Sequence, residues 1–226
     1  MSLEDFAQRV GLDRINPSLL QRALTHRSYI NEHPDAIEDN ERLEFLGDAA
    51  LDFIAATWLY NRYPEMDEGD LTRLRSSLVR TEQLADFAKE LDLGEGLLLG
   101  RGEESSGGRD RAALLCDAFE AVIGAMFLDS GLDEVFRFLE PRFIKAANAA
   151  LEDETLLDPR SQLQIWAQAE MGVTPQYETV GFSGPDHQRE FLVEVTIGQE
   201  LKEQGRGRSK QEAAQDAAKK LLSKIR

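Results

Sequence analysis

Carboxylate side chains recur along one apolar segment of the chain, NERLEFLGDAALDF at residues 40–53. Glu41, Glu44 and Asp48 are spaced three and then four residues apart, which places their side chains on one face of a helix. A stripe of three anions repels itself. Such a face is stable only when water surrounds it or when a cation lies between the carboxylates.

A second pair of acids lies in LLCDAFEAVIGAMF, residues 114–127. Asp117 and Glu120 are three residues apart and share a helical face, while the residues around them are apolar. If the two helices pack together, four carboxylates converge on a site for hard divalent cations, which prefer oxygen ligands. Spacing alone favours the simpler interpretation, two solvated helix faces, and leaves the metal site open as the alternative.

The composition limits the kinds of site that the chain can hold. Its 226 residues are 42% hydrophobic and include one cysteine and three scattered histidines, which excludes a disulfide framework and a cysteine–histidine zinc cluster. We interpret the single Cys116 as a small buried residue. No segment is long and apolar enough to cross a bilayer, and the start MSLEDFAQRV lacks the pattern of a secretory signal. We therefore expect a cytoplasmic protein with no membrane partner.

The net charge of −16 is unevenly distributed and predicts a domain boundary. Residues 158–226 contain 10 Lys or Arg and 10 Asp or Glu, whereas residues 1–157 contain 16 and 32. Between them, in LEDETLLDPR, apolar periodicity lapses and an Asp-Pro step disfavours helix. We expect one domain at 1–150, a linker at 151–157 and a second domain at 158–226.

The apolar period differs between the two predicted domains. In the first, apolar residues recur every three or four positions and predict helices, at 18–26, 42–63, 68–79, 81–93, 111–131 and 132–151. Gly94 and Gly131 are expected to end two of them. In the second, a helix at 161–171 precedes strand-like runs and a final helix, at 174–184, 189–199, 200–209 and 209–225. The fold class is an all-α domain followed by a small α+β (α-β-β-β-α) domain, with both helices on one face of an antiparallel sheet.

These segments closely resemble the ribonuclease III family in residue identity and in order. NERLEFLGDAALD contains the family's LEFLGD signature, THRSY precedes it, and EGDLTRLRSSLV and GGRDRAALLCDAFEAVIGAMFLDSG follow it. The C-terminal unit resembles the double-stranded RNA-binding domain of bacterial members. The resemblance implies an endoribonuclease that hydrolyses double-stranded RNA and leaves 5'-phosphate and 3'-hydroxyl ends with short 3' overhangs. It also implies processing of ribosomal RNA precursors and other structured transcripts.

The resemblance assigns roles to the acids. Four of them match the family's metal ligands, namely Glu44, Asp48, Asp117 and Glu120. Asp48 and Glu120 are expected to be catalytic, and Glu41 and Glu68 match two further acids close to substrate. The implied cofactor is Mg²⁺, with Mn²⁺ as a substitute. Paired metal ions roughly 4 Å apart activate water on one side of a phosphodiester and stabilise the leaving oxygen on the other.

The phosphate contact of the second domain is expected at its basic C-terminal end. Residues 202–226 contain 8 Lys or Arg and 3 Asp or Glu. Lys210 begins the last predicted helix, where free N–H groups and the helix dipole favour a phosphate. The resemblance implies that Lys210 contacts the RNA backbone across the major groove. Gln211 replaces a second basic residue of the family, which predicts weaker binding.

The minor-groove contacts are expected on the first helix and first loop of the second domain. Gln164 and Gln168 are four residues apart and share a face, so their amides can meet ribose 2'-hydroxyl groups. His187 matches the family's loop contact in the adjacent minor groove. Such contacts recognise the A-form shape of the RNA duplex rather than its base sequence. Ile165 stands where the family often has glutamate, a second departure expected to weaken binding.

Phe45 is a large apolar residue between the ligand Glu44 and Leu46. On a helix it points about 100° away from Glu44, so it must pack elsewhere. An intramolecular core contact is one possibility. The resemblance favours a socket on a second subunit, because family nuclease domains form two-fold dimers. A homodimer presents two acid clusters, each of which cuts one strand of the duplex.

Two other functions are compatible with the sequence. One is a non-catalytic duplex-RNA-binding protein, which loss of an acid would indicate, although none of the four is missing. The other is a helical nucleoside-triphosphate pyrophosphohydrolase, which also lines helices with metal-binding acids. That second alternative leaves the C-terminal unit unexplained.

Overall fold

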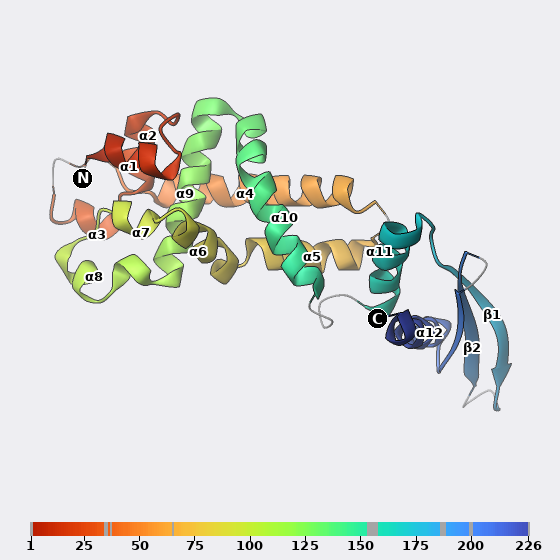
Figure 1. Ribbon diagram of the computed structural model, residues 1–226. Coiled ribbons are helices and arrows are strands. Elements are labelled where there is room, and N and C mark those ends of the chain that lie inside the picture. The colour runs from red at the N-terminus through yellow and green to blue at the C-terminus, as the bar shows by residue number, and fades with distance from the viewer. Residues whose placement is uncertain are drawn as a thin grey trace. The chain divides into compact units, whose positions relative to one another are not determined.

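The computed structural model describes residues 2–33, 36, 38–64, 66–152, 158–185, 189–198 and 201–225 (Figure 1). Its elements follow one another as α1 (Leu3–Val10), α2 (Pro17–Ala23), α3 (Arg27–Ile30), α4 (Glu41–Arg62), α5 (Glu68–Val79), α6 (Thr81–Glu90), α7 (Leu93–Gly96), α8 (Arg101–Ser105), the 3-10 helix η1 (Gly108–Asp110), α9 (Ala112–Ser130), α10 (Leu132–Glu152), α11 (Pro159–Met171), β1 (Gln176–Ser183), β2 (Glu190–Ile197), β3 (Leu201–Gly207) and α12 (Lys210–Ile225). Within the described ranges, no helix combines the length and apolar character needed to span a membrane.

The chain divides into two compact units, Met1–Arg62 with Leu74–Asn148, and Tyr63–Arg73 with Ala149–Arg226. The described elements of the first are all helical, and the second contains the α-β-β-β-α run, so the predicted fold class is confirmed. α10 continues through Glu152, two residues into the predicted linker. Residues 153–157, the rest of that linker, lie outside the described residues.

Helix α9 is the buried centre of the first unit. Ten of its 19 residues are buried, as expected for a helix that is apolar on nearly every side. Helices α2, α4 and α6 pack around it. The centre of the Phe119 ring lies 5.6 Å from that of Phe87 on α6. The acids of α9 therefore lie on a helix that is packed against three others.

The helix that begins at Thr81 ends earlier than predicted. It stops at Glu90, and Asp92 takes a left-handed conformation with φ of 51°, which a short polar side chain tolerates. Gly94 lies inside α7 and has a packing role, since a Cβ there would lie 2.6 Å from the Arg109 carbonyl oxygen. Gly131 does follow the end of α9, with φ of 79°.

The second unit packs two helices on one face of an antiparallel sheet of order β1-β2-β3, as predicted. Leu163 of α11 and Leu221 of α12 share one core with Val195 of β2. Strand β3 approaches α12 closely because Gly205 has no side chain. A Cβ at that position would lie 2.1 Å from the backbone nitrogen of Ala217.

Candidate active site

A pair of glycines sets the separation of the two acid-bearing helices. A Cβ on Gly47 of α4 would lie 1.8 Å from the backbone oxygen of Glu120, and a Cβ on Gly124 of α9 would lie 2.2 Å from that of Leu43. The contact is reciprocal, because the absence of a side chain on each glycine leaves room for the backbone of the other helix. It occurs at the level of the acids, so the close approach of α4 and α9 brings their carboxylates together.

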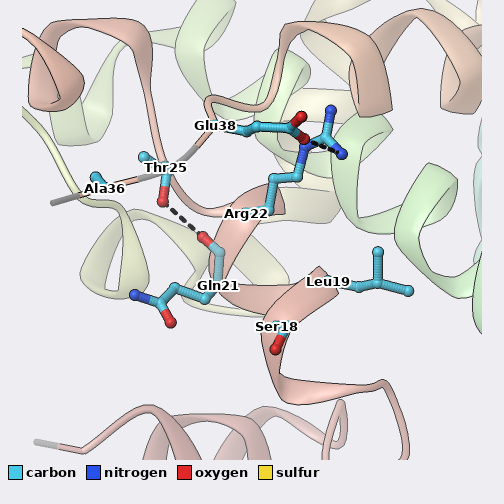
Figure 2. Close-up of a pocket in the computed structure, with 7 residues that line it drawn as sticks. All are labelled: Ser18, Leu19, Gln21, Arg22, Thr25, Ala36 and Glu38. Atoms are coloured by element: carbon cyan, nitrogen blue, oxygen red, sulfur yellow. Dashed lines mark hydrogen bonds and ion pairs between the residues drawn. The ribbon is translucent and has the colours of Figure 1, made fainter.

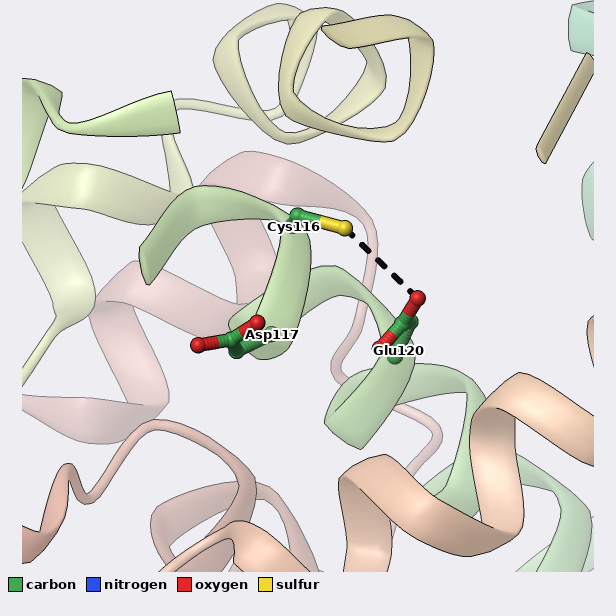
Figure 3. A group of neighbouring side chains, drawn as sticks. All are labelled: Cys116, Asp117 and Glu120. Carbon is green, nitrogen blue, oxygen red and sulfur yellow. Dashed lines mark hydrogen bonds between the residues drawn. The ribbon is translucent and has the colours of Figure 1, made fainter. Parts of the chain in front are cut away.

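The negative charges of the predicted metal acids help to raise the pKa of two of them, Glu44 and Glu120. Burial, followed by the negative charges of Asp117, Glu41 and Asp48, raises the pKa of Glu44. Burial, followed by the charge of Asp48 and with further contributions from Asp117 and Glu44, raises the pKa of Glu120 to about 7. Carboxylate oxygens of Asp117 and Glu120 lie within 4.8 Å of each other (Figure 3). The arrangement concentrates negative charge in a partly desolvated place.

The basic side chain that acts on this cluster is His26, whose charge partly offsets the raised pKa of Asp117. Across the described part of the chain, no Lys or Arg forms an ion pair with Glu44, Asp48, Asp117 or Glu120. Desolvated carboxylates without a counter-charge are unfavourable unless they take up protons or coordinate a cation. Their donors are oxygens, which suit hard divalent ions such as Mg²⁺ and Mn²⁺. The residues present therefore fit a divalent metal centre.

Two further residues, Cys116 and His26, interact with the acids of α9. Cys116 is buried as predicted, and its thiol also donates a hydrogen bond to Oε1 of Glu120 at 3.5 Å. The four-residue spacing from 116 to 120 was the signal for that contact. His26 caps α3 and its Nδ1 lies 2.8 Å from Oγ of Ser28. Burial raises the pKa of Asp117, and the charge of His26 opposes that shift.

The two secondary acids differ in their surroundings. Glu41, at the start of α4, pairs with Arg27 at 3.0 Å, and its charge contributes to the raised pKa of Glu44. Part of its charge is therefore already compensated. Glu68 is the exposed first residue of α5 and belongs to the second compact unit.

Phe45 projects from α4 into solvent, with 80% of its surface exposed. An intramolecular core contact for this residue is therefore wrong. Phe53 and Tyr60, eight and fifteen residues further along α4, are also largely exposed, at 59% and 72%. These spacings place the three aromatic rings close to one helical face.

Lys210 is the exposed first residue of α12, as the sequence predicted. Ser209 precedes it and caps the helix, because its Oγ accepts from the backbone N–H of Glu212 at 3.1 Å. A hollow of about 370 Å³ lies beside it, lined by Arg160, Tyr177, Thr179, Val193, Lys210, Gln211 and Ala214. Two cationic side chains thus border one hollow at this end of the second unit.

The predicted minor-groove residues are partly within the described structure. Gln164 and Gln168 both lie on α11, with Gln168 exposed and Gln164 half-buried. Ile165 lies between them on the same helix. His187 lies outside the described residues.

A larger hollow of about 450 Å³ lies beside α2 (Figure 2), lined by Ser18, Leu19, Gln21, Arg22, Thr25, Ala36 and Glu38. Among the described residues that line it, Arg22 is the one with a cationic side chain. Glu38 pairs with that guanidinium, and Nε of Arg22 donates to the Asp39 carbonyl oxygen at 3.2 Å. With its charge compensated, this hollow does not offer a phosphate site.

Gly47→Ala tests the glycine contact. The added methyl group must separate α4 from α9, so we expect a loss of about 1–3 kcal/mol in the free energy of unfolding and a lower metal affinity. Gly102→Ala is the matched control, because a Cβ at that helical position meets nothing within 4 Å. Denaturant unfolding of both variants measures the difference. Equal stability of the two would show that the helices do not depend on this contact.

Known proteins match the chain over nearly its whole length. A family model described as Ribonuclease-III-like matches residues 16–147, and one described as the double-stranded RNA binding motif matches 159–225. Ribonuclease 3 of Roseiflexus sp. (strain RS-1) is 49% identical over 99% of this chain and 96% of its own length. Ribonuclease 3 of Bacillus cytotoxicus is 45% identical over 98% and 90%.

A solved structure supports the same assignment for the helical part. The nuclease domain of ribonuclease III from Campylobacter jejuni matches with a TM-score of 0.58 and 35% identity, over 64% of this chain and 98% of that domain. The order of the two family matches is also the order of the two folds along the chain. The chain therefore belongs to the ribonuclease III family of double-stranded RNA endoribonucleases.

Proposed function

We propose that the acid cluster of α4 and α9 hydrolyses phosphodiester bonds in double-stranded RNA that the C-terminal unit binds. The observation that carries this proposal is the convergence of Glu44, Asp48, Asp117 and Glu120, none of which forms an ion pair with Lys or Arg in the described structure. The match of residues 159–225 to a double-stranded RNA binding motif supports the substrate. That match also counts against a nucleotide pyrophosphohydrolase.

The family implies a divalent metal ion, and we propose Mg²⁺, with Mn²⁺ as a substitute. Glu44, Asp48, Asp117 and Glu120 would hold it, because four carboxylates supply hard oxygen donors. When bound, divalent ions provide an activated water for in-line attack and compensate charge on the leaving 3'-oxygen. The carboxylates of Asp48 and Glu120 orient the reacting groups in this proposal. The products carry 5'-phosphate and 3'-hydroxyl ends.

The remaining site residues are proposed to contact RNA. Glu41 and Glu68 would lie near substrate at the nuclease site. Gln164 and Gln168, together with His187, would contact the minor groove. Lys210 would contact a backbone phosphate, which its exposure at the N-terminus of the 16-residue helix α12 supports.

The proposed domains are a catalytic and dimerisation domain at 1–150, a linker at 151–157 and an RNA-binding domain at 158–226. The family matches at 16–147 and 159–225 support these limits. The Campylobacter jejuni relative is described as having a region involved in dimer formation of its nuclease domain. We propose the same assembly here, a homodimer through Phe45, whose two clusters cut opposite strands and leave short 3' overhangs.

The proposed cellular role is the processing of ribosomal RNA precursors and other structured transcripts in the cytoplasm. The family membership supports this role. The test of the whole proposal is incubation of the full chain with Mg²⁺ and a long RNA duplex. Short duplexes with 5'-phosphate ends are expected, with little cleavage of single-stranded RNA of the same length. Intact duplex that remains bound to the protein would instead support a non-catalytic RNA-binding protein.

Lys210→Ala tests the phosphate contact. Loss of one contact should weaken duplex binding on all sequences and make the plot of log affinity against log salt shallower by about one unit. Lys220→Ala is the control, because Asp216 already pairs with Lys220 at 2.7 Å. Binding titrations at several salt concentrations measure both variants. A Lys210→Ala protein that keeps its affinity but cuts at different sites would show that Lys210 reads sequence.

A further inference from the structure

A second group of carboxylates lies outside the nuclease site, within the second compact unit. Asp67 immediately precedes α5, Asp70 lies in the first turn of that helix, and Asp158 immediately precedes α11. One carboxylate oxygen from each residue lies within 4.8 Å of the others. Asp67 is exposed, Asp158 is half-buried and Asp70 is fully buried. These acids are separate from the cluster of α4 and α9.

Helix capping accounts for two of these acids. Oδ1 of Asp67 accepts a hydrogen bond from the backbone N–H of Asp70 at 2.9 Å, and Oδ1 of Asp158 accepts one from that of Arg160 at 2.8 Å. Aspartate is common at this position because its side chain satisfies a free N–H group at the start of a helix. A carboxylate offers about four acceptor sites, so both capping residues keep capacity for a further ligand.

Capping does not account for Asp70. Its side chain is 0% exposed, and Oδ1 pairs with Arg73. Oδ2 is buried and has no hydrogen-bond partner among the described residues. Burial raises the pKa of Asp70, and the hydrogen bond with Arg73 opposes the shift. A buried, charged acceptor without a partner is unfavourable, so Oδ2 indicates a ligand that compensates negative charge.

The charge and spacing of the group suit one divalent cation. Of the ion pairs in the described structure, one involves these acids, that of Asp70 with Arg73. Three carboxylates and one guanidinium leave two negative charges. Ca²⁺ binds oxygen at about 2.3–2.6 Å, so two oxygens on opposite sides of the ion lie roughly 4.6–5.2 Å apart. The oxygens of this group, within 4.8 Å of one another, fit around one such ion.

We infer that Asp67, Asp70 and Asp158 form a binding site for a hard divalent cation such as Ca²⁺, in addition to the nuclease site. The donors are carboxylate oxygens, which these ions prefer. The exposed Asp67 gives the ion access from solvent. The bound ion joins the start of α5, where Glu68 lies, to the start of α11, the helix that carries Gln164. It shares no ligand with the acid cluster of α4 and α9, so its binding is independent of the proposed cleavage reaction.

Ca²⁺ alone is the probe, titrated by calorimetry into the full metal-free chain without RNA. The titration uses the Glu120→Gln chain, in which binding at the nuclease site is weakened, and we expect one Ca²⁺ per chain to bind at the second site. In that background Asp67→Asn and Asp158→Asn should each weaken this binding at least about tenfold, because one anionic ligand is lost. Asparagine also caps helices, so both variants should fold. Asp70→Asn should abolish the binding.

Asp86→Asn is the matched control, since Asp86 is an acid of α6 whose side chain is 60% exposed and pairs with Lys89 at 2.9 Å. It should keep the Ca²⁺ affinity. Absence of Ca²⁺ binding in the Glu120→Gln chain, or equal affinity in the Asp67, Asp158 and Asp86 variants, would overturn the inference and assign a proton, rather than a cation, to Asp70. Cleavage of duplex RNA in Mg²⁺ by the unaltered chain tests the proposed function separately.

Discussion

Glu120→Gln is expected to leave double-stranded RNA binding intact and to slow cleavage in Mg²⁺ at least about a thousandfold, equal to about 4 kcal/mol of transition-state stabilisation. The amide has the shape of the carboxylate but carries no charge, so one negative charge is lost from the cluster and, with it, one proposed metal ligand. Glu120 is the acid that burial and its neighbours perturb most strongly in that cluster, with a pKa raised to about 7. Single-turnover cleavage of a labelled duplex measures the loss, and a gel-shift titration measures binding.

The stability of the variant separates a chemical effect from a folding effect. Removal of one charge from a crowded group of anions should not lower the unfolding temperature of the metal-free protein. Asp52→Asn, the corresponding acid-to-amide substitution on an acid of α4 whose side chain is 49% exposed, should cut RNA at nearly the normal rate. Glu120 would not be a ligand if its glutamine variant cleaved duplex RNA in ordinary Mg²⁺ as fast as the Asp52 control.

The sequence predicted the elements that carry the site, because helical spacing is a local property. Glu44 and Asp48 share a face through a four-residue interval, and Asp117 and Glu120 through a three-residue one. Local spacing cannot state which helices touch. The structure shows that α4 and α9 meet at the level of these acids, and residue spacing along the chain does not predict this tertiary contact.

Two glycines in the sequence nevertheless indicate the contact between α4 and α9. A glycine inside a helix is destabilising by roughly 0.5–1 kcal/mol relative to alanine, so Gly47 and Gly124 within long apolar helices imply a packing reason. Their mutual backbone contact supplies that reason. Gly94 shows the opposite case, since its position suggested a helix end but its role is close packing within α7. A glycine alone does not distinguish these roles.

A mixed dimer of one unaltered subunit and one Glu120→Gln subunit is expected to nick duplex RNA on one strand only. Each cluster in the proposed dimer contains acids from α4 and α9 of a single chain, so each subunit can cut without the other's carboxylates. Differently tagged subunits allow the mixed dimer to be purified, and denaturing and native gels distinguish nicks from double-strand breaks. A mixed dimer that severs both strands in one encounter would contradict one cut per subunit.

Phe45→Glu should abolish that dimer and, with it, most double-strand cleavage. Phe45 is 80% exposed in the single chain, and burial of a phenylalanine side chain in a partner contributes about 1.5–3 kcal/mol per copy, twice in a symmetric interface. A carboxylate in its place loses that contribution and must also be desolvated. Sedimentation should show a monomer, whereas Phe182→Glu, the same change on an exposed aromatic residue of the second unit, should leave the dimer intact. A Phe45→Glu monomer with full activity would mean that cleavage of both strands does not require two subunits, and the exposed ring would then need a different partner.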